Sequence, residues 1–354
     1  MAFLNIKTTR KCLIKYLILA TVAAVLTSVY KNRLTLRTYY DHYNLDDRSY
    51  YEDVDLKYPV KVQPNLIRLI NPSKPMYPLT INAPYLIENP DLCRSVQNLT
   101  VLVVFNTATD HFERRQAIRN TWTNDSYYSD LATVRVLFLL GRTTNRIVQA
   151  GIEMEFKEHK DILQGDFIDS YYNLTHKGVM GFKWITERCR NAEMILKMDD
   201  DILVNMFIYL YRLRHVKAVQ TANVYCDYQP GIISRDSKYK WYAGENHFRG
   251  VKSYLSFCKG KFVSMTNDIM PSLYLSASKT PFFHLDDVLL FGYVMHKVPG
   301  LHYQTLAEED MQDNSLEAKQ CLNIKREKCP YFVIQAGSVV DMADIWSTIL
   351  KHFK

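Results

Sequence analysis

Three continuous apolar runs constrain the fold more than any other feature of this sequence. They read LTVLVVFN (99–106), TVRVLFLLG (133–141) and AEMILKM (192–198). Apolar runs without alternation are typical of strands buried on both faces of a parallel sheet. Between the runs, RRQAIRNTW (114–122) and NLTHKGVMGFKWITERC (173–189) have the apolar spacing of helices. Strands that alternate with helices predict an α/β fold with a mostly parallel central sheet flanked by helices.

Three adjacent aspartates, Asp199, Asp200 and Asp201, follow the third run directly. Ligands bind beyond the carboxyl ends of the strands in open α/β sheets. Clustered carboxylates repel one another unless a cation neutralises them, and Mg²⁺ or Mn²⁺ prefers such oxygen ligands. Side chains two residues apart in an extended segment point the same way, so Asp199 and Asp201 are predicted to share one divalent ion. The alternative is an acidic loop in water; an EF-hand is excluded because the required glycine and glutamate are missing.

A second acidic pair lies in FFHLDDVLLFGYVMHK (282–297), where Asp286 and Asp287 precede an apolar segment with helical spacing. A carboxylate held in apolar surroundings can serve as a general base. The alternative is that these residues cap the helix, because the helix dipole stabilises acidic side chains at the N-terminal end.

The N-terminal region predicts a membrane anchor and a stem. Residues 12–30 are apolar apart from Lys15 and are just long enough to span a bilayer. We therefore expect a cytoplasmic tail (1–11) and an uncleaved transmembrane signal anchor (12–30), with a cleaved signal peptide as the alternative. Seven of the twelve prolines fall in 31–92, which indicates a stem, and 93–354 is expected to be the folded lumenal domain.

Charge and cysteine content narrow the class of protein. The net charge of +7 arises from seven basic residues within 1–37, while the other 37 basic residues balance 37 acidic ones. The folded part therefore lacks the basic surface of a nucleic-acid binder. Six cysteines outside the anchor are compatible with three disulfides in an oxidising lumen, with free thiols as the alternative; they are Cys93, Cys189, Cys226, Cys258, Cys321 and Cys329.

Several motifs occur in order from Leu99 to the C-terminus. They are RRQAIRNTW, FLLG, DILQGDFIDSYYNLTHKGVMGFKW, KMDDDILVN, FCKGKFVSM and LDDVLLFG. Together they resemble the β1,3-galactosyltransferase and β1,3-N-acetylglucosaminyltransferase family, to which Fringe is also related. The resemblance implies a GT-A-type nucleotide-sugar transferase fold behind an anchor and stem. It also implies a single-pass type II protein of the Golgi membrane with its catalytic domain in the lumen.

The resemblance assigns roles to both acidic clusters. It implies that Mn²⁺ (manganese) bridges the donor diphosphate at Asp199 and Asp201, with Asp200 near the ribose or the donor sugar. It also implies that an acidic residue of the second pair deprotonates the acceptor hydroxyl; Asp287 is our choice for this base and Asp286 is the alternative.

Four further residues are expected near the donor. The motif that contains Arg115 and Arg119 lies at the nucleotide end of the family's fold, and Arg115 is the predicted contact to UDP. The resemblance makes Asp169 and Lys177 candidates near the donor, with structural hydrogen bonding as the alternative.

Two departures from the family pattern affect the expected site. Gln335 stands where relatives carry a histidine that completes the metal shell, and His302 is a possible replacement. An amide oxygen is a weaker ligand than imidazole, so weaker metal binding is expected. In addition, a small-residue turn near the acceptor retains only Gly260, between Lys259 and Lys261, and these cations could favour acidic glycans.

These observations lead to one main functional prediction. The protein is expected to be a metal-dependent inverting hexosyltransferase that uses a UDP-sugar. It would transfer a hexose or N-acetylhexosamine, with galactose favoured, in β1,3 linkage to a glycan acceptor on a glycoprotein or glycolipid. The alternative is an inactive lumenal glycan-binding protein on the same scaffold. A soluble metal-dependent nucleotidyltransferase would also use acidic pairs, but the predicted anchor argues against it.

Overall fold

The computed structural model describes residues 84–217, 221–245, 247–248 and 250–353. Those up to Ile349 belong to one compact unit. The predicted tail (1–11), the signal anchor (12–30) and most of the stem lie outside the described residues. Within the described ranges, no helix has the length and apolar character needed to span a bilayer.

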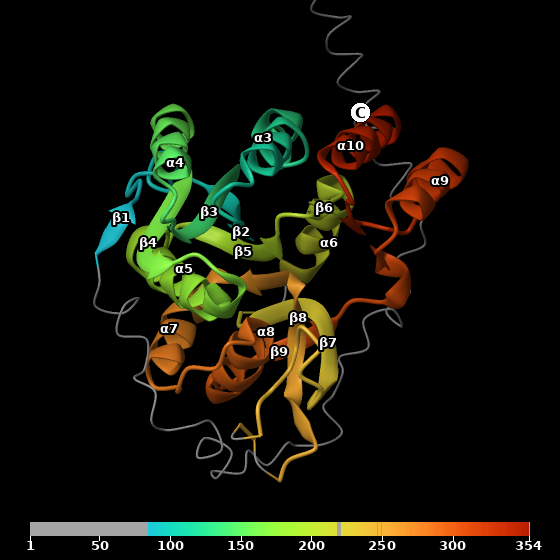
Figure 1. Cartoon of the computed structure of the whole chain (residues 1–354). Helices are drawn as coiled ribbons and strands as arrows, with labels where there is room; N and C mark the ends of the chain where they lie inside the picture. Colours follow the sequence, from blue (N-terminus) through green and yellow to red (C-terminus); the bar gives the residue numbers. More distant parts are fainter. Residues whose placement is uncertain (1–83, 218–220, 246, 249, 354) are drawn as a thin grey trace, which may run out of the picture. The chain divides into compact units, whose positions relative to one another are not determined.

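An eight-stranded sheet forms the centre of the fold, with strand order β1-β4-β3-β2-β5-β8-β7-β9 (Figure 1). Its strands are β1 (Tyr85–Ile87), β2 (Leu99–Asn106), β3 (Val134–Arg142), β4 (Ile162–Ile168), β5 (Ala192–Asp199), β7 (Asn223–Ile232), β8 (Ser253–Thr266) and β9 (His302–Thr305). The three apolar runs form β2, β3 and β5, as the sequence predicts, and β2 pairs in parallel with both others. Their side chains are buried because helices cover both faces of this part of the sheet.

The sheet is mixed: β1 is antiparallel to β4 at one edge, and β7 pairs in parallel with β9 at the other. Strands β4, β3, β2 and β5 run in parallel, whereas β8 pairs antiparallel with β5 and with β7. A smaller sheet has the order β10-β11-β6, built from β6 (Ile202–Val204), β10 (Met311–Gln312) and β11 (Val333–Gln335). The antiparallel pairing of β11 with β6 sets Gln335 opposite Ile202. This small sheet therefore brings a C-terminal residue next to the aspartates that follow β5.

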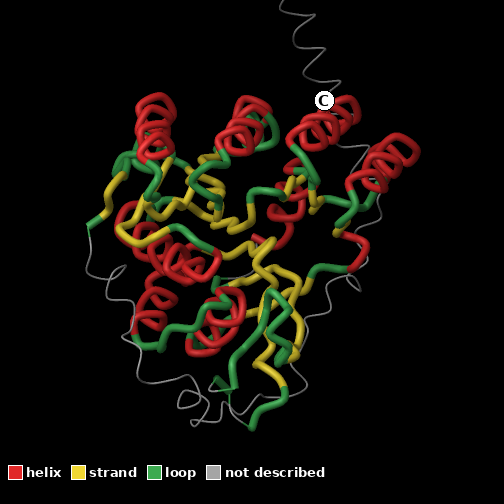
Figure 2. Tube along the Cα trace, viewed as in Figure 1, coloured by secondary structure: helices red, strands yellow, loops and turns green. Residues whose placement is uncertain are grey.

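Helices α3 and α4 lie on one face of the parallel strands, and α5 and α7 lie on the other (Figures 1 and 2). The helices are α3 (Phe112–Asn120), α4 (Arg146–His159), α5 (Leu174–Arg188), α6 (Met206–Lys217), α7 (Met270–Ser278), α8 (Asp286–Val288), α9 (Ser315–Lys325) and α10 (Val339–Phe353). Short helical segments occur at η3 (Asp125–Tyr127), η4 (Tyr171–Asn173), η5 (Asn267–Ile269), η6 (Leu289–Val294), η7 (Met295–Lys297), η8 (Glu308–Asp310) and η9 (Arg326–Lys328). Most of α5 is buried, including Val179, Phe182 and Ile185.

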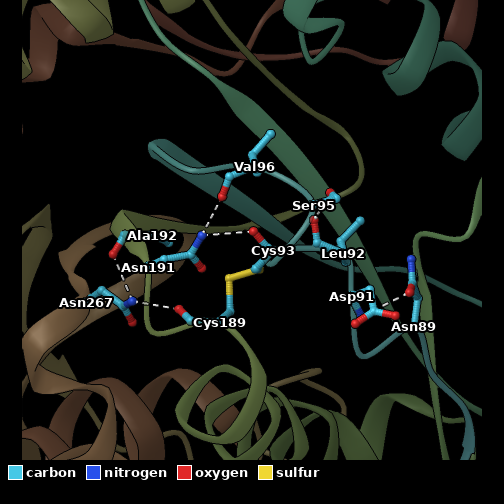
Figure 3. The surroundings of a disulfide bond; sticks show 10 residues. All are labelled: Asn89, Asp91, Leu92, Cys93, Ser95, Val96, Cys189, Asn191, Ala192 and Asn267. Carbon is cyan, nitrogen blue, oxygen red and sulfur yellow. Dashed lines mark hydrogen bonds between the residues drawn. A yellow bond between two sulfur atoms is a disulfide. The ribbon is translucent and has the colours of Figure 1, made fainter.

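All six cysteines expected to pair do so, which confirms three disulfides. Cys226–Cys258 links β7 to β8, and Cys321–Cys329 connects α9 with the turn that follows it. Cys93–Cys189 joins the segment before β2 to the end of α5 (Figure 3). The Asn191 side chain donates hydrogen bonds to the Cys93 and Val96 carbonyls, so the same junction is also fixed by polar contacts.

The folded domain begins before its predicted boundary at Cys93. Strand β1, in the predicted stem, pairs antiparallel with the edge strand β4. The Tyr85 hydroxyl also donates to Glu187 Oε2 at 3.0 Å. A three-residue edge strand carries too little sequence pattern to be detected without its partner, which explains the error.

Candidate active site

The two predicted acidic clusters meet beyond the carboxyl ends of β2 and β5. Asp199 is the last residue of β5 and lies beside Asn106, the last residue of β2. Asp286 and Asp287 form the first turn of α8. The Asn106 side-chain amide lies 3.5 Å from Asp286 Oδ2, so β2 contacts both clusters. The site therefore occupies the position at which open α/β sheets bind ligands.

Lys197 lies between the two clusters. Its Nζ atom is 3.4 Å from Asp199 Oδ1 and 3.9 Å from Asp286 Oδ2, and it donates to the Gly260 carbonyl at 2.7 Å. Burial lowers the pKa of Lys197, but the negative charges of Asp199, Asp286 and Asp287 outweigh burial and raise that pKa above its usual value. The lysine is therefore a buried positive charge at the centre of the site.

In the second acidic pair, Asp286 is buried and Asp287 is partly exposed. Burial is the main cause of the raised pKa of both carboxyl groups; the Asp286 charge adds to the effect on Asp287, whose pKa rises to about 7. A carboxylate with a pKa near the working pH suits a general base. The N-cap position belongs to Leu285, so neither aspartate is the capping residue that the alternative interpretation required.

Asp201 contacts Gln335 directly. Gln335 Nε2 lies 2.8 Å from Asp201 Oδ2, and the Ala336 N–H donates to the Asp201 carbonyl at 2.7 Å. Burial raises the pKa of Asp201, and the charges of Asp199 and Asp200 add to this, although the Gln335 hydrogen bond opposes it. His302 cannot take the place of Gln335. His302 lies in β9 and pairs with Asn223 of β7. Across the sheet, this pair is level with the beginning of β5, whereas the aspartates lie at its end.

Asp200 faces the loop that follows β2. It accepts hydrogen bonds from Thr107 Oγ1 and His111 Nδ1, each at 2.6 Å. The His111 side chain is 43% exposed, so its ring can also reach a bound molecule. His111 and Thr107 were not predicted from the sequence, because nothing in it links this loop to Asp200.

Asp169 and Lys177 contact each other and internal backbone groups. Lys177 is buried, with its Nζ atom 2.9 Å from Asp169 Oδ2 and 2.6 Å from the Thr107 carbonyl. Asp169 also accepts from the Gly141 N–H at 2.7 Å. This network ties α5 to the ends of β2 and β3. These contacts support the structural alternative, and a place for the two residues near the donor stays a prediction.

Arg115 and Arg119 are also internal. Arg115 is fully buried: its guanidinium pairs with Glu155 at 2.7 Å and donates to the Ala108 carbonyl at 2.7 Å. Arg119 pairs with Glu155 and with Asp161, each at 2.7 Å. Both side chains are directed to internal partners in this structure. Their role as UDP contacts stays a prediction. Arg115 fixes the loop after β2 that carries Thr107 and His111.

The two lysines beside Gly260 each have an acidic partner. Lys259 Nζ lies 2.9 Å from Asp227 Oδ2, and Lys261 Nζ lies 2.6 Å from Asp313 Oδ1. Their charges are compensated within the protein, which removes the reason to expect a preference for acidic glycans.

The residues around Asp199 fit an open site for a hard divalent ion. Asp199, Asp201 and Gln335 supply two carboxylates and an amide. In the ranges that the structure describes, no group of three or more His, Cys, Asp or Glu side chains could hold a metal. A closed protein site is thus not formed. Sites for Mg²⁺ commonly use only one or two carboxylates together with substrate phosphate and water, and this donor set matches that type.

Residues 113–306 match the family model described as Galactosyltransferase, which covers more than half of the chain. The chain belongs to the galactosyltransferase family.

Two relatives of this galactosyltransferase-family chain extend the comparison. Beta-1,3-galactosyltransferase 1 of Homo sapiens is 32% identical over 220 residues, which are 62% of this chain and 66% of the relative. Lactosylceramide 1,3-N-acetyl-beta-D-glucosaminyltransferase of Rattus norvegicus is 28% identical over 274 residues, 74% of this chain and 69% of the relative. The resemblance to β1,3-galactosyl- and β1,3-N-acetylglucosaminyltransferases is thereby confirmed.

A solved galactosyltransferase, crystallised with donor and acceptor sugar analogs, aligns with 70% of this galactosyltransferase-family chain and 95% of its own. Its sequence identity is 10% and its TM-score is 0.35, too low to support an argument about the fold.

Proposed function

We propose that this protein is a metal-dependent inverting hexosyltransferase of GT-A type that uses a UDP-sugar as donor. It transfers a hexose or N-acetylhexosamine, with galactose favoured, to a glycan acceptor in β1,3 linkage. The proposal includes the type II Golgi topology expected from residues 12–30. One observation carries it: Asp199 and Asp286 both lie within 4 Å of Lys197 Nζ. The proposed donor ligands and the acidic pair that contains the proposed base, Asp287, therefore lie next to each other.

The first acidic cluster is proposed to hold the donor. Asp199 and Asp201, with Gln335 beside them, would bind Mn²⁺. When bound, this ion would neutralise charge on the departing diphosphate as a Lewis acid. Asp200 and His111 would contact the ribose or the donor sugar, because they contact each other directly beside the proposed metal ligands Asp199 and Asp201.

The second cluster is proposed to activate the acceptor. Asp287 would accept the proton of the attacking hydroxyl while that oxygen approaches the anomeric carbon from the face opposite UDP. The bond to the UDP oxygen breaks as the new glycosidic bond forms, so no covalent enzyme intermediate is required. Alignment of the two substrates contributes to the rate along with the base.

The test is UDP release by the purified full-length chain from UDP-galactose, UDP-N-acetylglucosamine and UDP-N-acetylgalactosamine, with and without Mn²⁺. We expect release that requires the metal and is abolished in the Asp199→Ala, Asp201→Ala double variant. The control is Glu153→Ala with Glu158→Ala, which removes two exposed carboxylates from α4. A wild-type chain that is folded but inactive with every donor would instead favour the inactive glycan-binding protein.

A further inference from the structure

Lys197 is an unusual residue for the middle of a buried strand. Its side chain is 7% exposed, and its neighbours in β5 are apolar. A buried ammonium group loses its hydration, and this loss is tolerated only when anionic or polar partners replace the water. Its partners are the Gly260 carbonyl, at 2.7 Å, and the Asp199 and Asp286 carboxylates. Burial of the lysine is therefore explained by this site.

The carboxylates around Lys197 come from different parts of the chain. Asp199 ends β5, whereas Asp286 begins α8, and the two belong to opposite functional halves of the proposed site. Asp286 is buried, so an adjacent carboxylate would repel it strongly without a positive charge between them. Lys197 is the positive charge in contact with both.

We propose that Lys197 is a positioning residue whose buried ammonium group binds Asp199 and Asp286 together, which couples the donor side of the site to the acceptor base. This inference rests on the proposed metal site at Asp199 and Asp201. The lysine is an internal counter-ion: it shares Asp199 with any divalent ion that binds there, and it opposes that ion by like-charge repulsion. The donor diphosphate, being anionic, offsets the repulsion, so the ion and the donor bind better together than the ion binds alone.

This role predicts two opposite effects of removing the charge. In Lys197→Met, the divalent ion no longer meets a fixed positive charge, so Mn²⁺ alone should bind about tenfold more tightly. The same variant should lose kcat, with a smaller change in KM for the donor, because Asp286 and its neighbour Asp287 lose the group that orients them. A lysine with only a packing role would not tighten metal binding.

The experiment is a calorimetric Mn²⁺ titration of the full-length wild type, Lys197→Met and Lys197→Arg, together with thermal melts with and without Mn²⁺. We expect Lys197→Met to bind Mn²⁺ more tightly than the wild type does and to have a lower melting temperature without metal. Mn²⁺ should raise the melting temperature of this variant by more than it raises that of the wild type. Lys197→Arg, which keeps the charge, should lie closer to the wild type. The control Lys319→Met removes a lysine paired with Asp341 and should change neither metal affinity nor kcat.

Equal Mn²⁺ affinity and equal stabilisation by Mn²⁺ in the wild type and Lys197→Met would overturn the inference.

A wild type that neither binds Mn²⁺ nor releases UDP would overturn the proposed function instead. In that case, the counter-ion role is decided by melts without metal of Lys197→Met, Asp286→Asn and the double variant. Recovery of stability in the double variant relative to Lys197→Met supports the role, and additive losses overturn it. The double variant decides in the same way if Lys197→Met does not fold: a folded double variant supports the role, and an unfolded one overturns it.

Discussion

Asp287 packs directly against the backbone of Gly260, with no room between them for a side chain. A Cβ atom on residue 260 would overlap Asp287 Oδ1 and lie 2.8 Å from Lys197 Nζ. The Gly260 backbone also hydrogen-bonds to the Asp287 carboxylate and lowers its pKa, against the larger effect of burial. The glycine is needed here because the base and strand β8 approach each other closely.

Gly260→Ala should therefore displace Asp287 and lower kcat by about 100-fold, since misplacement of a reacting group by about 1 Å has effects of this size. Steady-state kinetics with the preferred donor and acceptor would measure it. Gly244→Ala is a matched control, because an added Cβ there meets no atom nearer than 3.7 Å. Unchanged kcat in Gly260→Ala would show that the position of Asp287 is not important for the reaction.

Asp287→Asn should lower kcat by about 10²- to 10⁴-fold, the usual contribution of a general base, while UDP binding is retained. The pH profile follows from the raised pKa of Asp287, about 7. Only the ionised carboxylate accepts a proton, so kcat/KM should fall as the pH decreases through this value. Full activity of Asp287→Asn together with loss of activity in Asp286→Asn would identify Asp286 as the base.

Gln335→His should tighten Mn²⁺ binding by about tenfold, or about 1.4 kcal/mol. The reason is that a neutral imidazole is a stronger ligand than an amide, and residue 335 already contacts Asp201. Calorimetry without donor would measure the dissociation constant. If the constant does not change, residue 335 lies outside the metal shell.

Arg115→Ala should destabilise the fold by about 3–5 kcal/mol, the range for loss of one partner from a buried ion pair, with the loss at the lower end because Arg119 still pairs with Glu155. Chemical denaturation would report this loss. Arg142→Ala, whose ion pair with Asp166 is half-exposed, should cost at most about 1 kcal/mol. A stable Arg115→Ala variant with a raised KM for the donor would instead support the predicted contact to UDP.

The parallel centre of the sheet could be predicted because each of the strands β2, β3 and β5 is apolar enough to be recognised from its own residues. LTVLVVFN and AEMILKM are apolar enough to indicate burial on both faces, and parallel pairing follows from the helices between them. The antiparallel strands β7 and β8 were not predicted, since their alternating and irregular burial reflects pairing with distant segments. Strand β1 was missed because its three residues carry too little sequence pattern.

At the site, the aspartates could be located because like charges after a buried strand are hard to explain otherwise. The internal partner of Arg115 could not be predicted, because Glu155 lies 40 residues away and no local pattern connects the two. Lys197 also carries a signal in the sequence. A lysine inside an apolar strand, two residues before an aspartate, indicates a buried charge that requires partners.

The disulfide Cys93–Cys189 separates β1 from the rest of the domain when force is applied to the chain. Strand β1 is held to β4 by backbone hydrogen bonds at an edge, whereas Cys93 is covalently joined to the end of α5. A force applied from the N-terminal side can peel β1 away but is stopped at Cys93 and carried into the α5–β5 junction. Tension on the chain, or proteolytic cutting before residue 93, would therefore leave the strands that hold the aspartates in register.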